Sequence, residues 1–208
     1  MKTPYRKYIL KRFKTFAWIY DYTFLLIFWV RKQSLKFIDP KKDQKILDLC
    51  CGTGTLSIKL AEFGAKVKGI DLSPHMLKKA RKKNPTGNFI EGDATNLPFK
   101  DCEFDTVVAS FCLHEMPTEV IEKTLKEMGR VVRKNGEIFI IDFSLPKNRV
   151  LRFFGYNFLR IFECAYYSNF VKLDLEKLLK SAKLTSTHKK SILAGFGRML
   201  KIKKSTWK

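Results

Sequence analysis

Two carboxylates and two glycines stand at spacings that suit the binding of a nucleoside. Asp48 lies inside the otherwise apolar segment 46–49, and Gly52 and Gly54 follow directly. Because glycine lacks Cβ, the backbone there can approach a ligand closely, and a helix beginning after the turn would direct free N–H groups toward that ligand. Asp71 ends the next apolar segment, where a carboxylate can accept hydrogen bonds from two ribose hydroxyls. This order of strand, glycine turn, helix, strand and acid predicts a nucleoside-cofactor site.

The glycine turn departs from the dinucleotide pattern G-x-G-x-x-G. Ser57 stands where that pattern has its third glycine, which allows close packing of the helix on the strand beneath a pyrophosphate. The departure disfavours a nicotinamide-dependent oxidoreductase, which stays an alternative at this point and would be favoured by tight binding of NADH.

Strands alternate with helical segments along the rest of the chain. The expected strands are 46–49, 65–70, 88–91, 104–110 and 137–143, and the expected helices are 55–63, 74–83, 118–132 and 172–182. This alternation predicts an α/β fold with a parallel, doubly wound sheet. Asn135-Gly136 is expected to form a turn before the fifth strand. The segment 184–204 predicts two final strands on either side of residues 195–197.

Five motifs in this order resemble the class I S-adenosylmethionine-dependent methyltransferases, above all the branch of the ubiquinone/menaquinone C-methyltransferases and the phospholipid N-methyltransferases. The motifs are 47–54, 69–77, 92–94, 97–99 with 104–105, and 130–137. The resemblance implies a Rossmann-like fold with a seven-stranded, mostly parallel sheet, an antiparallel last strand pair and an N-terminal helical cap. It also implies S-adenosyl-L-methionine as the cofactor.

The resemblance implies a set of cofactor-binding residues that begins in the glycine turn and extends to the end of the fourth strand. They are Asp48, Cys50, Gly52, Gly54, Asp71, Leu72, Met76, Asp93, Ala94 and Ser110. Asp48 would hold the amino group of the methionine end through a charge-assisted bond, and Asp71 would take the ribose hydroxyls. Leu72 and Met76 would pack on the adenine, whose edge would meet Asp93 or the amide of Ala94.

Simpler roles exist for the two carboxylates, since Asp48 could cap a turn and Asp71 could interact with a helix dipole. Cys50 stands where the family usually has glycine. Packing beneath the methionine end of the cofactor is therefore expected to differ from the family pattern.

Methyl transfer requires mainly that acceptor, methyl group and sulfur be aligned. A base is needed only where the acceptor must lose a proton, and the candidates are His114, Glu115, Tyr20, Tyr22 and Asp142. His114 is the best base by its ordinary pKa, with a capping or surface histidine as the alternative. Glu115 is expected to face solvent. Tyr20 is expected to close over the cofactor, because residues 20–21 resemble a Tyr-Asp pair in the cap of related lipid and quinone enzymes.

The positive charge of the chain is confined to its two flanks. The net charge is +21, with 12 basic and 3 acidic residues in 1–45, 14 of each in 46–145, and 15 basic and 3 acidic residues in 146–208. We therefore expect a basic, aromatic N-terminal helical cap over 1–45 and a methyltransferase domain over 46–208. Residues 146–170 are expected to form an acceptor-side insertion, in which 149–162 predicts a helix with an apolar wall and a basic rim, or else a helix that faces the core.

Three interpretations of the basic flanks are open: an ordinary lysine-rich surface, nucleic-acid binding, and contact with an anionic membrane. The basic, amphipathic segment 5–14 followed by the apolar run 24–30 favours the membrane. The apolar run is too short to span a bilayer and has no signal-peptide cleavage site. We therefore expect peripheral attachment to the inner face of the membrane.

The five cysteines form no zinc spacing, so we expect no metal site and a reducing cytoplasm.

These observations predict a methyltransferase that acts on an apolar or amphiphilic acceptor at a membrane, either a phospholipid amine headgroup or a quinol. The alternatives are an RNA methyltransferase, a methyltransferase of a soluble small molecule, and a non-catalytic module that retains the cofactor site. Residues 110–113 lack the Pro-Pro motif of base amino methylation, which disfavours that form of nucleic-acid chemistry. The sequence carries no indication of the oligomeric state.

Overall fold

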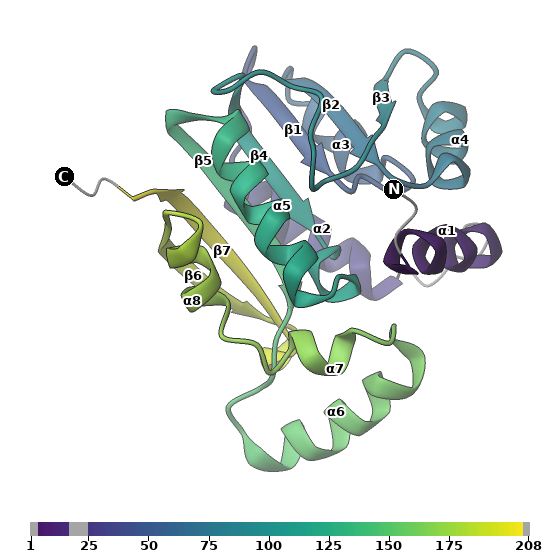
Figure 1. The fold of residues 1–208 in the computed structure, drawn as a ribbon, viewed down its shortest axis with the longest axis vertical. Helices are drawn as coiled ribbons and strands as arrows, with labels where there is room; N and C mark the ends of the chain where they lie inside the picture. Colours follow the sequence, from purple (N-terminus) through teal and green to yellow (C-terminus); the bar gives the residue numbers. More distant parts are fainter. Residues whose placement is uncertain (1–3, 17–24, 206–208) are drawn as a thin grey trace.

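The computed structural model describes residues 4–16 and 25–205, and its centre is one seven-stranded sheet (Figure 1). The strands are β1 (Lys45–Leu49), β2 (Lys66–Asp71), β3 (Asn88–Glu91), β4 (Phe104–Ser110), β5 (Val132–Phe143), β6 (Leu184–Ile192) and β7 (Gly197–Lys204). The helices are α1 (Pro4–Phe16), α2 (Leu25–Ile38), α3 (Thr55–Ala61), α4 (Pro74–Lys83), α5 (Thr118–Val131), α6 (Arg149–Phe162), α7 (Tyr167–Phe170) and α8 (Leu175–Ser181), with 3-10 turns η1 (Leu113–Glu115) and η2 (Leu193–Gly195).

The strand order is β3-β2-β1-β4-β5-β7-β6, and only β7 runs antiparallel to its neighbours. This confirms the predicted class I fold, including the antiparallel final pair. The chain moves outward in one direction from β1 to β3 and in the other from β4 to β6, and β7 then lies between β5 and β6. Ligands of such sheets bind beyond the carboxyl ends of the strands at this reversal, so the reversal between β1 and β4 is where the site is expected.

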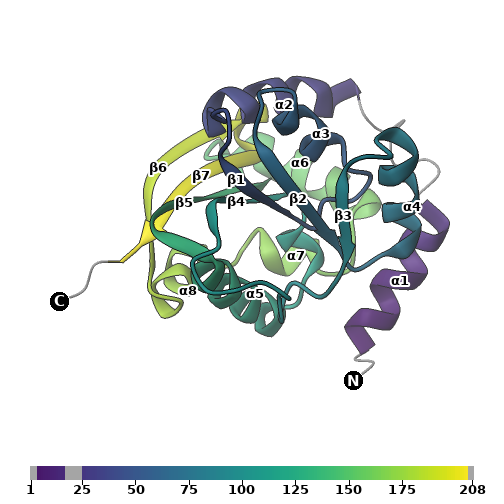
Figure 2. The same cartoon turned by 90° about the horizontal axis from the view of Figure 1, so that it is seen from above.

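Helices cover both faces of the sheet (Figure 2). On one face α2 and α3 bury apolar side chains such as Val30 and Leu60 against β1, β4 and β5, and α4 continues this layer with Leu77 and Ala80. On the other face α5, α7 and α8 pack on the same strands through residues that include Leu125. The two apolar layers hold the strand ends in fixed positions relative to one another, which is what a preformed site requires.

The boundary of β5 differs from the expectation by more than one residue. Asn135-Gly136 does not form a turn that precedes β5, since β5 already begins at Val132, opposite Phe104. The pairing shifts register before Thr106, which lies opposite Glu137. A bulge of this kind accommodates the additional residues within a continuous strand, so the turn-forming pair is absorbed into the sheet.

Candidate active site at the strand ends

Two adjoining cavities lie at the reversal point. Both are lined by Tyr5, Cys50, Asp71, Leu72 and Met116. The first, here called the Asp93 cavity, has an empty volume of about 310 Å³ and is also lined by Asp93, Ala94 and Val120. The second, here called the Glu115 cavity, has about 460 Å³ and is also lined by Gly52, Met76, Ile9, Phe13, Phe111 and Glu115.

Asp71 connects the second strand to the glycine turn. Its Oδ2 accepts a hydrogen bond from the Gly52 amide at 2.8 Å, and its Oδ1 accepts one from the Ser73 amide at 2.8 Å. Burial raises the pKa of Asp71 to about 6, although both backbone bonds act to lower it. A carboxylate has about four acceptor positions, so Asp71 can clamp the turn and still accept two hydrogen bonds from the cavity.

The turn contains two glycines with different roles. Gly54 leaves room for neighbouring side chains, and Gly52 leaves its backbone open to the cavity. Gly54 has φ +72°, and a Cβ there would lie 2.7 Å from the Phe89 ring and 2.9 Å from Ala80. Gly52 has φ +55°, and a Cβ there would meet nothing within 4 Å, because that direction is open. Gly54 therefore packs the turn against α4 and β3, whereas Gly52 keeps the backbone accessible from the Glu115 cavity.

Cys50 occupies the position where the family pattern has glycine, and it keeps the backbone that glycine favours. Its φ is +55°, a left-handed conformation that costs a side-chain-bearing residue roughly 1–2 kcal/mol. The side chain lines both cavities and acts to raise the pKa of the buried Cys112 thiol. The departure therefore places a sulfur atom in the cavity wall where a family member would have open space.

Asp48 is buried beneath the turn and does not line either cavity. Its exposed fraction is 1%, and its Oδ2 accepts a hydrogen bond from the Ser57 hydroxyl at 2.5 Å. Burial raises the pKa of Asp48 to about 7, with the bond from Ser57 acting in the opposite direction. Ser57, which breaks the dinucleotide pattern, thus satisfies a buried carboxylate. The predicted contact of Asp48 with the methionine end stays a prediction.

The structure brings together seven of the ten predicted cofactor-binding residues around the two cavities: Cys50, Gly52, Asp71, Leu72, Met76, Asp93 and Ala94. Gly54 supports the turn from behind. Ser110 ends β4 without lining a cavity, and the next residues, Phe111 and Cys112, line the Glu115 cavity instead.

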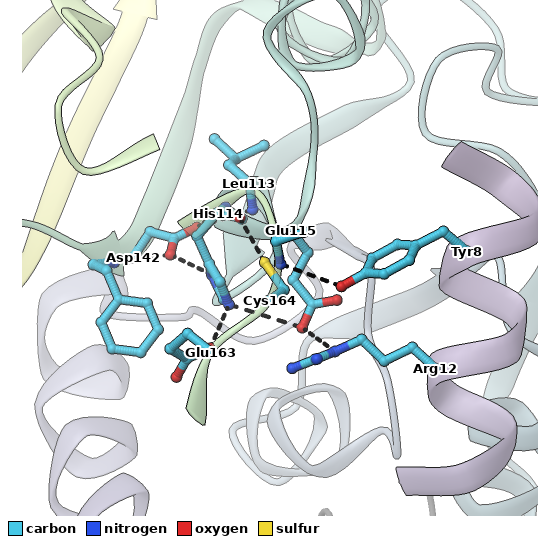
Figure 3. A network of polar contacts seen from close by, with 10 residues as sticks. Tyr8, Arg12, Leu113, His114, Glu115, Asp142, Glu163 and Cys164 are labelled. Carbon is cyan, nitrogen blue, oxygen red and sulfur yellow. Dashed lines mark hydrogen bonds and ion pairs between the residues drawn. The ribbon is translucent and has the colours of Figure 1, made fainter. Parts of the chain in front are cut away.

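A network of charged side chains lies beside the Glu115 cavity (Figure 3). The His114 ring places Nδ1 2.7 Å from Oδ1 of Asp142, and its Nε2 lies 3.8 Å from Oε1 of Glu115 and 3.6 Å from Oε2 of Glu163. Arg12 of α1 reaches the same Glu115 oxygen at 3.6 Å. Five charged groups from four separate parts of the chain therefore meet at η1.

The carboxylates around His114 favour its protonated form. Burial alone would lower its pKa, but Asp142 and then Glu115 and Glu163 raise it to about 9. The ring is not among the side chains that line the cavities. At neutral pH the imidazole therefore holds its proton, and its role as a base stays a prediction that requires this proton to be lost first.

Glu115 does not face solvent, so that prediction was wrong. Its exposed fraction is 8%, and it lines the Glu115 cavity. Desolvation raises its pKa, against the lowering effect of His114 and Arg12. The expectation failed because η1 lies under α1, an element distant in sequence.

Sequence reasoning also missed the α1 residues. Tyr5, Ile9 and Phe13 lie one helical turn apart and all line the Glu115 cavity. The amphipathic pattern of 5–14 was the available signal. Tyr20, which was expected to cover the cofactor, lies outside the residues that the structure describes.

Comparison with known proteins agrees with this geometry. A protein-family model described as a methyltransferase domain matches residues 46–136. An uncharacterized methyltransferase of Synechocystis is 35% identical over 146 residues, which are 70% of this chain and 69% of that protein. The chain belongs to the class I S-adenosylmethionine-dependent methyltransferases. It is an enzyme, and its methyl donor is S-adenosylmethionine.

Other relatives of this methyltransferase lie in the quinone branch. A demethylmenaquinone methyltransferase of Chlorobaculum tepidum is 36% identical over 162 residues, which cover 73% of this chain and 66% of that protein. This chain thus spans about two thirds of that relative. The solved magnesium protoporphyrin IX methyltransferase of Synechocystis, with bound S-adenosylhomocysteine, superposes with a TM-score of 0.64 at 22% identity, covering 85% of this chain and 83% of that one.

The residues of this methyltransferase fit the donor. The Asp93 cavity combines the apolar Leu72 and Val120 with the carboxylates of Asp71 and Asp93, which suits a purine attached to a ribose. The Asp93 carboxylate is fixed in place because its Oδ1 accepts hydrogen bonds from the amide and the hydroxyl of Thr95 at 2.9 and 2.7 Å. The Asp93 side chain is therefore held in one position in the cavity wall.

Proposed function

We propose that this methyltransferase methylates a quinol-type, membrane-resident acceptor. The observation that carries the proposal is the composition of the Glu115 cavity, which joins the donor site at Asp71 and Gly52 to an apolar wall with one buried carboxylate. An aromatic ring that bears a hydroxyl suits such a wall. The demethylmenaquinone methyltransferases among its relatives support the same class of acceptor.

The bound donor supplies an electrophilic methyl group on a positively charged sulfur. The chain's own contribution is to bind, align and exclude water. Asp71 and the Gly52 amide would hold the nucleoside side, while Ile9, Phe13 and Phe111 would confine a flat, apolar acceptor. We propose that α1 acts as the cap of this cavity, in keeping with Tyr5 lining both of its parts.

Helix α6 supports the membrane part of the proposal. Six of its large apolar side chains are exposed: Val150 65%, Leu151 47%, Phe153 65%, Phe154 69%, Phe158 62% and Ile161 75%. Arg149, Arg152 and Arg160 are exposed beside them. Aromatic side chains with nearby arginines suit the interface of an anionic bilayer.

The position of α6 suits this role. In Figure 1 the helix lies outside the layers that cover the sheet. It is attached to the fold on its other side, where Tyr156 stacks on Tyr167 with ring centroids 6.4 Å apart. No helix among the described residues has the length and apolar character to cross a bilayer. We therefore propose peripheral attachment through α6 at the cytoplasmic face of a membrane.

The test is a transfer assay with S-adenosylmethionine carrying a labelled methyl group. The purified protein is incubated with reduced demethylmenaquinone in anionic vesicles, with vesicles that contain phosphatidylethanolamine but no quinol, and with RNA. Label in the quinol is expected. Label in the phospholipid would identify the amine headgroup as the acceptor, and label in RNA alone would show that the basic flanks bind nucleic acid and would overturn the proposal.

A further inference from the structure

We propose that Glu115 binds and deprotonates the hydroxyl group of the acceptor. The inference rests on the proposed function, since it assumes an acceptor with an acidic hydroxyl on an aromatic ring. It assigns a catalytic contact to a side chain that lines the same cavity as Gly52 of the glycine turn.

The first observation is an unused acceptor atom. Among the described residues, Glu115 Oε2 is buried and has no hydrogen-bond partner, although the side chain lines the cavity. The other oxygen, Oε1, faces the cations of Arg12 and His114 at 3.6 and 3.8 Å. Buried carboxylate oxygens are rarely left unpaired in native proteins, so the free oxygen of Glu115 indicates a donor that arrives with a ligand.

The second observation is that the network fixes the carboxylate. Arg12 comes from α1 and His114 from η1. The Asp142 carboxylate accepts hydrogen bonds from the backbone amides of Leu113 and His114 at 2.9 and 3.3 Å. These bonds attach η1 to the end of β5. Glu115 is therefore presented to the cavity by contacts that do not involve its own Oε2.

The charges around Glu115 leave it able to take a proton. Tyr5 and Arg12 face it from α1, His114 from its own turn, Asp142 from β5, and Glu163 with Cys164 from the segment after α6. Burial raises the pKa of Glu115, as do Glu163 and Asp142, while His114 and Arg12 lower it. A raised pKa brings a carboxylate closer to that of the acid that it must deprotonate.

The proposed step is a proton transfer that increases the nucleophilicity of the ring. The O–H bond of the acceptor breaks, Glu115 Oε2 gains the proton, and the acceptor oxygen keeps the electron pair, which delocalises onto the neighbouring ring carbon. After that carbon has received the methyl group, it releases its hydrogen as a proton while Glu115 returns its own proton to the oxygen. One proton therefore leaves for each methyl group gained.

The first test measures binding and needs no turnover. The full-length protein saturated with S-adenosylhomocysteine is titrated with 1-naphthol and with 1-methylnaphthalene, which has a similar shape but no hydroxyl. Wild-type protein is expected to bind naphthol at least about tenfold more tightly, as for a hydrogen bond to a buried charge. Equal affinity for the two probes would overturn the inference without any variant.

Two variants locate the effect. Glu115→Gln is expected to lose most of the preference for naphthol while still binding S-adenosylhomocysteine, which also reports that it folds. Glu163→Gln is the matched control, because Glu163 contacts the same histidine without lining either cavity, and it should keep the preference. Equal losses in both variants would mean that the histidine network alone shapes the site, and would overturn the role of Glu115.

The second test separates this inference from the proposed function. With reduced demethylmenaquinone, Glu115→Gln should lower the single-turnover rate by about 100-fold or more and remove the acidic limb of the rate's pH profile. A wild-type rate in this variant would overturn the inference while the function stands. No transfer by the wild type, together with a Glu115-dependent preference for naphthol, would reject the quinol and leave the Glu115 contact supported.

Discussion

The two halves of the cavity are built in different ways. The half that we assign to the donor, around Asp71 and Gly52, is formed by backbone and short-range contacts, since the Asp71 carboxylate accepts hydrogen bonds from the amides of Gly52 and Ser73 at 2.8 Å. The half that we assign to the acceptor, around Glu115, is formed by side chains from remote segments, with Arg12 of α1 lying 3.6 Å from Glu115 of η1. We call these the donor half and the acceptor half. One half is thus fixed by the sheet, and the other depends on how α1 docks on it.

This difference has a physical cause. Backbone amides at strand ends and helix N-termini can bind a donor with little dependence on the identity of the side chains. The acceptor varies from one enzyme to another, so its half is made from elements that can change without disturbing the sheet.

Removing the Asp71 carboxylate should affect only the donor half. Asp71→Ala is expected to weaken S-adenosylmethionine binding by about 100-fold or more, because it removes the ribose acceptor and releases the Gly52 amide. Calorimetric titration measures this. Asp101→Ala is the matched control, since that carboxylate is exposed and pairs with Arg130. Comparable affinities in the two variants would contradict the assignment of the donor half.

The charge network around His114 should make the free energy of unfolding depend on pH. The pKa of His114 is raised to about 9 from an ordinary value of about 6.5. The protonated imidazole therefore stabilises the folded protein fully below about pH 6.5, and this contribution is lost as the pH rises through 9. His114→Gln should therefore reduce the loss of unfolding free energy between pH 6 and 9.5 by about 3 kcal/mol.

Urea denaturation at the two pH values measures this difference. His188→Gln, at an exposed position of β6, is the control and should leave the pH dependence unchanged. An identical loss of stability in His114→Gln and the wild type would show that the imidazole is not held as a cation.

Substitution of the two glycines of the turn should have different effects, one on stability and the other on cofactor binding. Both have positive φ, but only at Gly54 would a Cβ meet the Phe89 ring, at 2.7 Å. Gly54→Ala is expected to cost about 1–2 kcal/mol more unfolding free energy than Gly52→Ala, as measured by denaturation. Gly52→Ala should instead lower cofactor affinity more than stability. The reverse order would contradict the packing of the turn described above.

Helix α6 should contribute to membrane attachment and not to folding. Phe154→Ser combined with Phe158→Ser is expected to weaken binding to anionic vesicles by about tenfold, through lost apolar contact, with an unchanged melting temperature. Phe63→Ser is the matched control, since Phe63 is also exposed, at 52%, but lies in the turn that follows α3. Equal effects of both changes in a co-sedimentation assay would show that α6 has no special role.

The donor half could be predicted from the sequence because its determinants are local. Strand, glycine turn and acid follow one another closely, and β1 to β4 formed where their apolar runs predicted them. The seven predicted residues around the cavities are all contributed by these strand ends or by the helices that follow them.

The acceptor half could not be predicted in the same way. The burial of Glu115 depends on α1, roughly a hundred residues earlier in the chain, and no periodicity within η1 indicates it. The outward face of α6 has the same apolar spacing as a core helix, so the sequence left both orientations open. The left-handed backbone of Cys50 became visible only in the structure, because the residue type argues against it.

A structure of the protein with bound S-adenosylhomocysteine tests the division of the cavity most directly. We expect the ribose hydroxyls to contact Asp71, the adenine to lie between Leu72 and Ala94, and the volume beside Glu115 and Phe13 to stay open for the acceptor. A nucleoside that contacts Glu115 instead of Asp71, or S-adenosylhomocysteine that fills the Glu115 cavity, would contradict this expectation.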